Sequence, residues 1–222
     1  MKQIQVVMLG HKSQSGKDTI YDIIGKEMGF KRLAFADKLK YTVADLYDFS
    51  EEQMFGDEKD ILDLRYSNNR DLEFIADVVG ELDPNPDYLP YFTPRRVLQL
   101  FGQDQRSINP TIWADYIFNV RIPYMIEEEG ISRFLITDFR FKNEAIVAKK
   151  WESSSDFNTL QMVKVNRPNI KSKTAAGDIS ENDLNDFKYW TDTILNDGSL
   201  EDLEDRAKEV LTQHLPTNCT IF

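Results

Sequence analysis

The chain has 222 residues, of which 41% are hydrophobic and 29% charged, and its formal net charge at pH 7 is −11. This length and composition suit one soluble domain, or one domain with inserted lobes, around a full hydrophobic core. The negative charge argues against general nucleic-acid binding, which relies on surplus Lys and Arg, but it leaves room for a small polyanion in a locally basic pocket.

Neither a membrane segment nor a cysteine-based site is expected. No stretch approaches the roughly 20 apolar residues that span a bilayer, and the first residues lack the apolar run of a signal peptide, so we expect a cytoplasmic protein that binds no membrane. The single cysteine, Cys219, and the two histidines, His11 and His214, exclude an internal disulfide and a Cys- or His-based metal cluster. Any metal is therefore expected to be held by oxygen.

The first half of the chain begins with an apolar strand over residues 3–9, a glycine-containing loop and a helix over 17–28. A short second strand over 31–35 and a helix over about 38–47 follow. Residues 45–87 are rich in acidic side chains and end in a proline-rich turn, which predicts a surface insertion. Thr93 and Pro94 predict a helix with Thr93 as its N-cap. Asn109 and Pro110 repeat this start signal before a long helix to about residue 128.

The second half of the chain contains three more predicted strands. The first covers 134–138 and ends at the carboxylate of Asp138, and the others cover 161–165 and 193–195. A polar segment over 167–190 separates the last two, and an amphipathic helix over 199–215 follows them. Strands that alternate with helices predict an α/β fold in which helices cover both faces of a parallel sheet.

Residues 9–19 read LGHKSQSGKDT and nearly match the phosphate-binding loop in which four residues separate two glycines and Lys-Ser or Lys-Thr follows. Here five residues separate Gly10 from Gly16, and Asp18 stands in the place of the hydroxyl residue. Either Gly10 is displaced or His11 takes the place of the first glycine. Because the loop joins a strand to a helix, we expect it to bind nucleotide phosphates. The expected phosphate-binding residues are Ser13, Gln14, Ser15, Gly16, Lys17, Asp18 and Thr19.

Six blocks of sequence, in this order, resemble the deoxynucleoside monophosphate kinases of tailed bacteriophages: SGKDT, LAFADKLK, FGDEKD, TPRRVLQLFGQDQRSINPTIWAD, ITDFRFKNEA and ILNDGSLEDL. The resemblance covers most of the chain. It implies a P-loop NTPase three-layer sandwich of the nucleoside monophosphate kinase type, which uses ATP and Mg²⁺ to phosphorylate deoxynucleoside monophosphates for phage DNA synthesis. It also implies one domain over 1–222, with an acceptor-binding insertion at about 37–110 and a lid at about 167–190.

Two residues at and just after the end of the third predicted strand are assigned to the reacting phosphates. Arg140 is expected to clamp the acceptor or transferring phosphate, because a guanidinium can hold two phosphate oxygens, and the alternative is a surface salt bridge with Glu144. Asp138 resembles a carboxylate that orders Mg²⁺, and the alternative is that it caps the following helix. Asp18 is the second expected Mg²⁺ ligand, directly or through water, and its alternative role is also helix capping.

The resemblance implies further residues on the acceptor side and in the lid. Arg96 and Arg106 are expected to bind the acceptor, while Gln103, Asp104 and Trp113 are candidate base and sugar contacts. For Trp113, packing in the core is at least as good an explanation. The remaining assignments are Asp37 and Lys38 for the monophosphate lobe and Arg167, Lys171 and Lys173 for the lid over ATP. Lys17, Arg140 and Arg167 are the expected catalytic residues.

This assignment contains no catalytic base, and the chemistry explains why. The second pKa of a phosphate monoester is about 6, so the acceptor oxygen is already ionised near neutral pH. The protein must then position two polyanions and offset their repulsion. The chain departs from the family in the lid, where Asp178 and Ile179 precede Ser-Glu in place of the usual histidine, so no role of that histidine is carried over.

Two alternative functions remain. A P-loop kinase for another phosphorylated molecule, such as phosphomevalonate or dephospho-coenzyme A, would share the donor site. A non-catalytic nucleotide-binding module would bind nucleotide without acceptor-dependent release of ADP, although the chain lacks the Asn-Lys-x-Asp guanine signature. The sequence leaves the oligomeric state open, with a homodimer as one option.

Overall fold

The computed structural model describes residues 2–61, 63, 65, 93–168 and 179–213. The chain divides into two compact units, one formed by residues 1–36 together with 111–222, and the other by residues 37–110. Lys171, Lys173, His214 and Cys219 lie outside the described residues, as do most of the predicted acidic insertion and part of the predicted lid.

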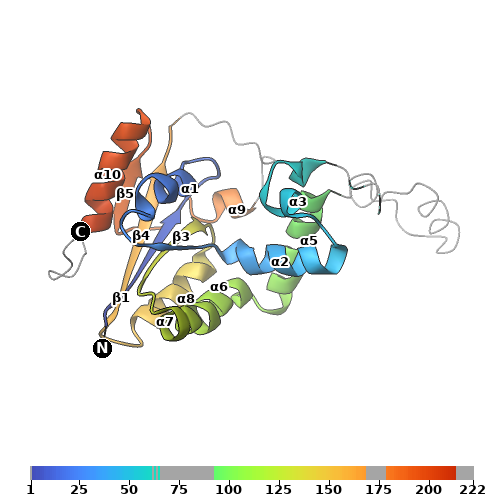
Figure 1. Cartoon of the computed structure of the whole chain (residues 1–222), viewed down its shortest axis with the longest axis horizontal. Coiled ribbons are helices and arrows are strands. Elements are labelled where there is room, and N and C mark those ends of the chain that lie inside the picture. Colours follow the sequence, from blue (N-terminus) through green and yellow to red (C-terminus); the bar gives the residue numbers. More distant parts are fainter. Residues whose placement is uncertain (1, 62, 64, 66–92, 169–178, 214–222) are drawn as a thin grey trace, which may run out of the picture. The chain divides into compact units, whose positions relative to one another are not determined.

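A five-stranded sheet forms the centre of the first unit (Figure 1). Its strands lie in the order β2-β3-β1-β4-β5, and every neighbouring pair is parallel. Their bounds are β1 Ile4–Gly10, β2 Lys31–Leu33, β3 Arg133–Phe139, β4 Asn158–Asn166 and β5 Asp192–Leu195. The predicted α/β fold with a parallel sheet is confirmed, and each of the five predicted strands is present within one to three residues of its expected ends.

The central position of β1 explains its composition. All seven of its residues are buried, as expected of a strand that has a neighbour on both sides and is covered on both faces. Because side chains alternate along a strand, Val7 and Leu9 point to one face and Val6 and Met8 to the other. All four are fully buried, so the expectation of a sheet covered on both faces is also confirmed.

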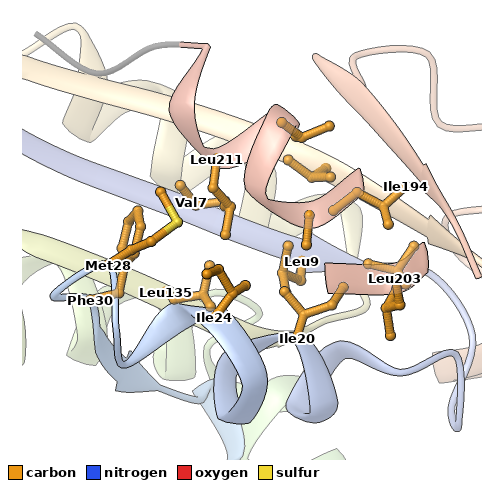
Figure 2. Packing of buried hydrophobic residues seen from close by; sticks show 14 residues of the cluster. Val7, Leu9, Ile20, Ile24, Met28, Phe30, Leu135, Ile194, Leu203 and Leu211 are labelled. Atoms are coloured by element: carbon orange, nitrogen blue, oxygen red, sulfur yellow. The ribbon is translucent and has the colours of Figure 1, made fainter. Parts of the chain in front are cut away.

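The core on one face lies between the sheet and two helical segments (Figure 2). The first segment consists of α1 Lys17–Ile20 and the π-helical turn η1 Tyr21–Gly25, and the second is α10 Leu200–Thr212. Figure 2 shows Ile20 and Ile24 packed near Leu203 and Leu211 across the strand residues Val7 and Leu9. The predicted helix over 17–28 is therefore α-helical only in its first turn. Ser199 caps α10 through a reciprocal pair of bonds with Asp202, which fixes where this helix begins.

The prediction that Asn109 and Pro110 start a helix is wrong. Asn109 is the C-cap of α5 Pro94–Ile108, and its N–H donates to the carbonyl of Gln105. A proline disfavours helical geometry in the residue before it, so Pro110 ends α5 instead of starting the next helix. The following helix, α6 Ile112–Tyr116, has Thr111 at its N-cap position, and the Thr111 hydroxyl donates to Asp115 at 2.6 Å.

The long helix expected up to about residue 128 is divided into three segments. After α6 come the π-helical turn η3 Ile117–Arg121 and α7 Ile122–Glu129. Pro123 lies in the first turn of α7 and has no N–H to donate to the preceding turn, which accounts for the irregular hydrogen bonding just before it. Helix α8 Lys142–Glu152 contacts strand β4 as well as α6 and η3.

The second unit is helical in its described part. It contains most of α2 Phe35–Tyr47, together with α3 Glu51–Phe55, η2 Glu58–Asp60 and α5. Thr93 caps α5 by accepting a hydrogen bond from the N–H of Arg96 at 3.2 Å, and Pro94 occupies the first turn, as predicted. Gly102 allows α5 to approach α2, because a Cβ at this position would lie 2.9 Å from Leu39. Among the helices of the described residues, none combines the length and apolar character needed to cross a membrane.

Candidate functional site: the loop after strand β1

The loop between β1 and α1 contains three residues with left-handed backbone geometry. These are His11, with φ of 95°, Gln14, with φ of 57°, and Gly16, with φ of 102°. In the phosphate-loop pattern the first glycine lies five positions before the second, which in this chain is His11. His11 has the positive φ that a glycine adopts without strain, so the structure favours the second reading of the motif, in which His11 takes the first-glycine position.

Gly10 has a packing role instead. A Cβ on Gly10 would lie 2.6 Å from Phe139 and 2.8 Å from Trp190. These rings belong to an aromatic cluster with Phe187, in which the ring centroids are 5.0 to 5.6 Å apart. The cluster lies directly against the last residue of β1, and it therefore supports the base of the loop.

Lys17 folds back into the loop. Its Nζ donates to the carbonyl of Lys12 at 2.5 Å and to the hydroxyl of Ser15 at 3.1 Å. The residue is only 5% exposed, and burial, followed by the nearby positive charge of Arg140, lowers the pKa of Lys17 from 10.5 to about 8. Two cationic side chains thus lie close together beside the loop. An anion bound there would offset their mutual repulsion.

The loop is held from outside by Asn196, just after β5. The Nδ2 of Asn196 donates to the carbonyl of Ser15 at 2.9 Å, and a Cβ on Gly16 would lie 2.5 Å from that nitrogen. The backbone N–H of Asn196 is itself bound to the carbonyl of Asn166 at the end of β4. Asn196 stands in the sixth block of the family resemblance, but nothing in the sequence predicts that it contacts the phosphate loop.

The carboxylate of Asp18 lies at the tip of β3. Its Oδ1 accepts a hydrogen bond of 2.7 Å from the hydroxyl of Thr137 and a weaker one of 3.3 Å from Arg32. The side chain is 70% exposed, so its second oxygen is accessible to solvent. Thr137 and Arg32 were not among the predicted site residues, because only the folded sheet brings them next to Asp18.

Asp138 binds the start of α2. Its two carboxylate oxygens accept the backbone N–H groups of Phe35 at 2.8 Å and Ala36 at 2.9 Å. The alternative role predicted for Asp138 was to cap the helix that follows it, which is α8. Asp138 does cap a helix, but that helix is α2. Glu144 caps the start of α8, because its Oε2 accepts the backbone N–H groups of Arg140 and Phe141 at 2.8 and 3.0 Å.

Asp18 and Asp138 also fit a magnesium site in which the protein supplies only one or two of the ligands. Among the described residues, no group of three or more Asp, Glu, His or Cys side chains is arranged to hold a metal. A nucleotide-bound Mg²⁺ keeps several waters and needs only one or two carboxylates in addition to phosphates. The exposed oxygen of Asp18 fits a direct or water-mediated contact. Both oxygens of Asp138 already accept a backbone N–H, so Asp138 fits a contact through water.

Arg140 does not form the predicted alternative side-chain salt bridge with Glu144. Its Nη1 donates instead to Oε1 of Glu181 at 2.7 Å. Glu144 is buried, and this burial, reinforced by the nearby charge of Asp138, raises its pKa from 4.5 to about 8. Glu144 is therefore largely protonated at neutral pH, which leaves Glu181 as the anionic partner of Arg140.

Glu181 was not among the predicted site residues. It lies in the short helix α9 Ile179–Asn182 and is 8% exposed. Besides Arg140, its two carboxylate oxygens accept the N–H of Ser13, at 3.0 and 3.2 Å. The same carboxylate thus contacts both the phosphate loop and the arginine assigned to the reacting phosphate.

His11 is half buried beside the same group of charges. Burial, followed by the positive charge of Lys164, lowers its pKa from 6.5 to about 4. The imidazole is therefore neutral at physiological pH.

The predicted acceptor-side residues lie mostly in the second unit. Asp37 and Lys38 are in the first turn of α2. Arg96, Gln103 and Arg106 are spaced by seven and three residues on α5, which places them along one side of that helix. Asp104 lies one residue further round the helix from Gln103, and Arg95 is bonded to Asp60. The structure thus aligns three of the four predicted α5 residues.

Two more predicted residues lie in the first unit. Trp113 is 9% exposed in α6, as expected for core packing, but its indole N–H has no hydrogen-bond partner among the described residues. Arg167 is exposed just after the end of β4. The structure therefore brings together Ser13, Lys17, Asp18, Asp138 and Arg140 at one end of the sheet, while the assigned roles of Trp113 and Arg167 stay predictions.

Comparison with known proteins gives one sequence relative and several structural ones. No family model matches the chain. It is 24% identical over 216 residues, covering 90% of the chain and 91% of the relative, to a protein of Acanthamoeba polyphaga mimivirus named "Putative deoxynucleotide monophosphate kinase". Dephospho-CoA kinase from Campylobacter jejuni is 16% identical, with a TM-score of 0.46 over 96% of this chain and 97% of that one. A sugar kinase from Janibacter sp. is 13% identical, with a TM-score of 0.42 over 94% of both chains.

Proposed function

We propose that this chain is a P-loop kinase that transfers the γ-phosphoryl group of ATP to a deoxynucleoside monophosphate. The observation that carries the proposal is the pair of cations beside the loop: Lys17 Nζ donates to the loop residues Lys12 and Ser15, and Arg140 is joined to the N–H of Ser13 through the carboxylate of Glu181. Phosphoryl transfer between two polyanions needs such a concentration of positive charge. The order of the sequence blocks and the name of the mimivirus relative support the choice of acceptor.

On the donor side, the loop supplies backbone N–H groups and Lys17 supplies a mobile charge. Residues 13–16 lead into α1, which begins at Lys17, and the backbone N–H groups at the start of a helix favour bound anions. The Nζ of Lys17 bonds within the loop to a carbonyl and a hydroxyl, which are weak partners for an ammonium group. Phosphate oxygens would replace both partners with charged ones.

On the acceptor side, Arg140 holds the phosphate and no residue needs to remove a proton. The acceptor phosphate is ionised near neutral pH, since its second pKa is about 6. The fork of Arg140 can contact two of its oxygens and orient the third for attack on the γ-phosphorus. Within the second unit, Arg96 and Arg106 lie on one side of α5 and are the residues that the family resemblance implies for acceptor binding.

Magnesium would lie on the Asp18 side of the loop. When bound, Mg²⁺ neutralises charge on the β- and γ-phosphates during transfer. Asp18 would contact the ion or its waters, and Thr137 would fix the orientation of the Asp18 carboxylate through their 2.7 Å hydrogen bond. Asp138 would order a water of the same ion.

The test is release of ADP from ATP and Mg²⁺ with separate acceptors. These are the four deoxynucleoside monophosphates, their ribose counterparts, phosphomevalonate, dephospho-coenzyme A, and no acceptor. Lys17→Ala and Arg140→Ala should each lower acceptor-dependent release at least a hundredfold, in line with the loss of one charged transition-state contact. Arg121→Ala is the matched control, because Arg121 is partly exposed and pairs with Glu129 at 4.0 Å.

The acceptor decides between the alternatives. Release of ADP with one or more deoxynucleoside monophosphates supports the proposal. Release of ADP only with phosphomevalonate or dephospho-coenzyme A would mean that the protein is a kinase with a different acceptor. A protein that binds ATP but releases no ADP with any acceptor would be a nucleotide-binding module, and the proposed reaction would be wrong.

A further inference from the structure

Glu181 is a carboxylate in a place where a phosphate group would be expected. It accepts the backbone N–H of Ser13 in the loop and a 2.7 Å bond from Arg140, and it is close enough to Lys17 and His11 to influence the pKa of both. A buried carboxylate requires partners of this kind, because removal from water is costly unless charge and hydrogen bonds compensate. Every partner that Glu181 uses is one that a polyphosphate in the loop would also use.

The attachment of Glu181 to the loop is confined to its side chain. The residues that follow it are fixed by other contacts: Asp183 accepts the N–H of Lys142 at 2.7 Å, Leu184 is buried, and Phe187 packs against Phe139. Neither the Asp183 bond nor the Phe187 contact is made with residues 11–16 of the loop, although the aromatic cluster also packs against Gly10 at its base. The Glu181 carboxylate can therefore leave the loop while residues 183–190 keep their packing.

We propose that Glu181 is an internal anion that occupies the phosphate side of the loop and holds Arg140 until a nucleotide displaces it. Both the carboxylate and the phosphates of a nucleotide carry negative charge, so they compete for the N–H of Ser13 and for Nη1 of Arg140. Binding of the donor then has two consequences. The loop gains its ligand, and Arg140 becomes available for the acceptor.

This arrangement would restrict the reactive state to the nucleotide-bound protein. Without nucleotide, Arg140 is neutralised by Glu181 and cannot hold an acceptor phosphate at full strength. The competition lowers the apparent affinity of the loop for phosphates, because part of the binding free energy is used to displace Glu181. The release of Arg140 for an acceptor rests on the proposed kinase function, but the competition for the loop does not.

The test measures binding of inorganic tripolyphosphate by titration calorimetry, which requires no acceptor and no turnover. Glu181→Gln keeps the shape of the side chain and removes its charge, so we expect tripolyphosphate to bind about tenfold more tightly than to the unmodified chain. Asp186→Asn is the matched control. It removes one negative charge five residues away, from an exposed side chain that pairs with Lys142, and should leave the affinity within about twofold.

Each outcome decides the question. Equal or weaker binding by Glu181→Gln would overturn the competition, since the carboxylate would then be a positioning residue for the loop. Glu181→Ala serves as a second variant if Gln disturbs folding, and loss of folding in both would show a structural brace and overturn the proposal. Failure of every protein to bind tripolyphosphate would overturn the competition and the proposed function together, whereas unchanged but measurable binding overturns the competition alone.

Discussion

The contact between Gly16 and Asn196 predicts a measurable coupling between two positions 180 residues apart. Gly16→Ala places a side chain on a residue with φ of 102°, which costs about 1 to 2 kcal/mol in backbone strain. Its Cβ would also lie 2.5 Å from Nδ2 of Asn196, so the hydrogen bond from Asn196 to Ser15 would be lost at a further cost of about 1 kcal/mol. The expected destabilisation is about 2 to 3 kcal/mol.

The double-mutant cycle separates the two contributions. Asn196→Ala alone removes the hydrogen bond and should cost about 1 kcal/mol. In that background Gly16→Ala meets no amide and loses no hydrogen bond, so only the strain remains. The double variant should therefore be about 1 kcal/mol more stable than the sum of the single changes implies.

Urea denaturation gives the stabilities, and calorimetry with ATP and Mg²⁺ gives the affinity of the loop. Both single variants should bind ATP more weakly, because each disturbs the conformation that presents the N–H groups. Gly29→Ala is the control for strain without contact, since its φ is 73° and no atom lies within 4 Å of the added Cβ. Additive effects at Gly16 and Asn196 would refute the claim that Asn196 supports the loop through this contact.

Three further predictions follow from single residues. Because the pKa of Lys17 is about 8, this side chain is mostly deprotonated at pH 9 in the free protein, and bound phosphates raise that pKa. Binding of ATP should therefore take up a proton at pH 9 but not at pH 6.5. Calorimetry in buffers of different ionisation enthalpy measures this proton uptake. The pKa of Glu144 in the folded chain is raised to about 8, so between pH 4.5 and 8 the folded chain binds more protons at this position than the unfolded chain does. The free energy of unfolding should therefore fall as pH rises through this window. Glu144→Gln should remove that part of the pH dependence in urea denaturation, and an unchanged slope would contradict the raised pKa. Thr93→Ala should lower the unfolding free energy by about 1 kcal/mol through loss of the cap on α5, whereas Ser107→Ala near the other end of α5 serves as the control.

The strands and the capped helices were predictable because local patterns determine them. Apolar runs identified all five strands, and Thr93-Pro94 marked the start of α5. The same type of signal failed at Asn109-Pro110, where the preceding helix had not yet ended and Asn109 became its C-cap. A start signal and an end signal can have the same residues, and only the hydrogen bonds of the neighbouring turn decide between them.

The candidate site was predictable in part. Lys17, Asp18, Asp138 and Arg140 lie near or after strand ends, and they were assigned from position, chemistry and the family resemblance. Asn196 and Glu181 could not, because their contacts with the loop join residues 181 and 168 positions apart. The role of His11 was left open by the spacing of the motif, and its backbone φ favours one of the two readings.

The most direct test of the central claim follows the phosphoryl group itself. The chain would be incubated with ATP carrying a radioactive γ-phosphate, Mg²⁺ and each deoxynucleoside monophosphate, and the nucleotides would be separated. We expect label in the β-position of at least one deoxynucleoside diphosphate, and loss of that product in Lys17→Ala and Arg140→Ala but not in Arg121→Ala. Label that stays in ATP or appears only as inorganic phosphate would contradict it.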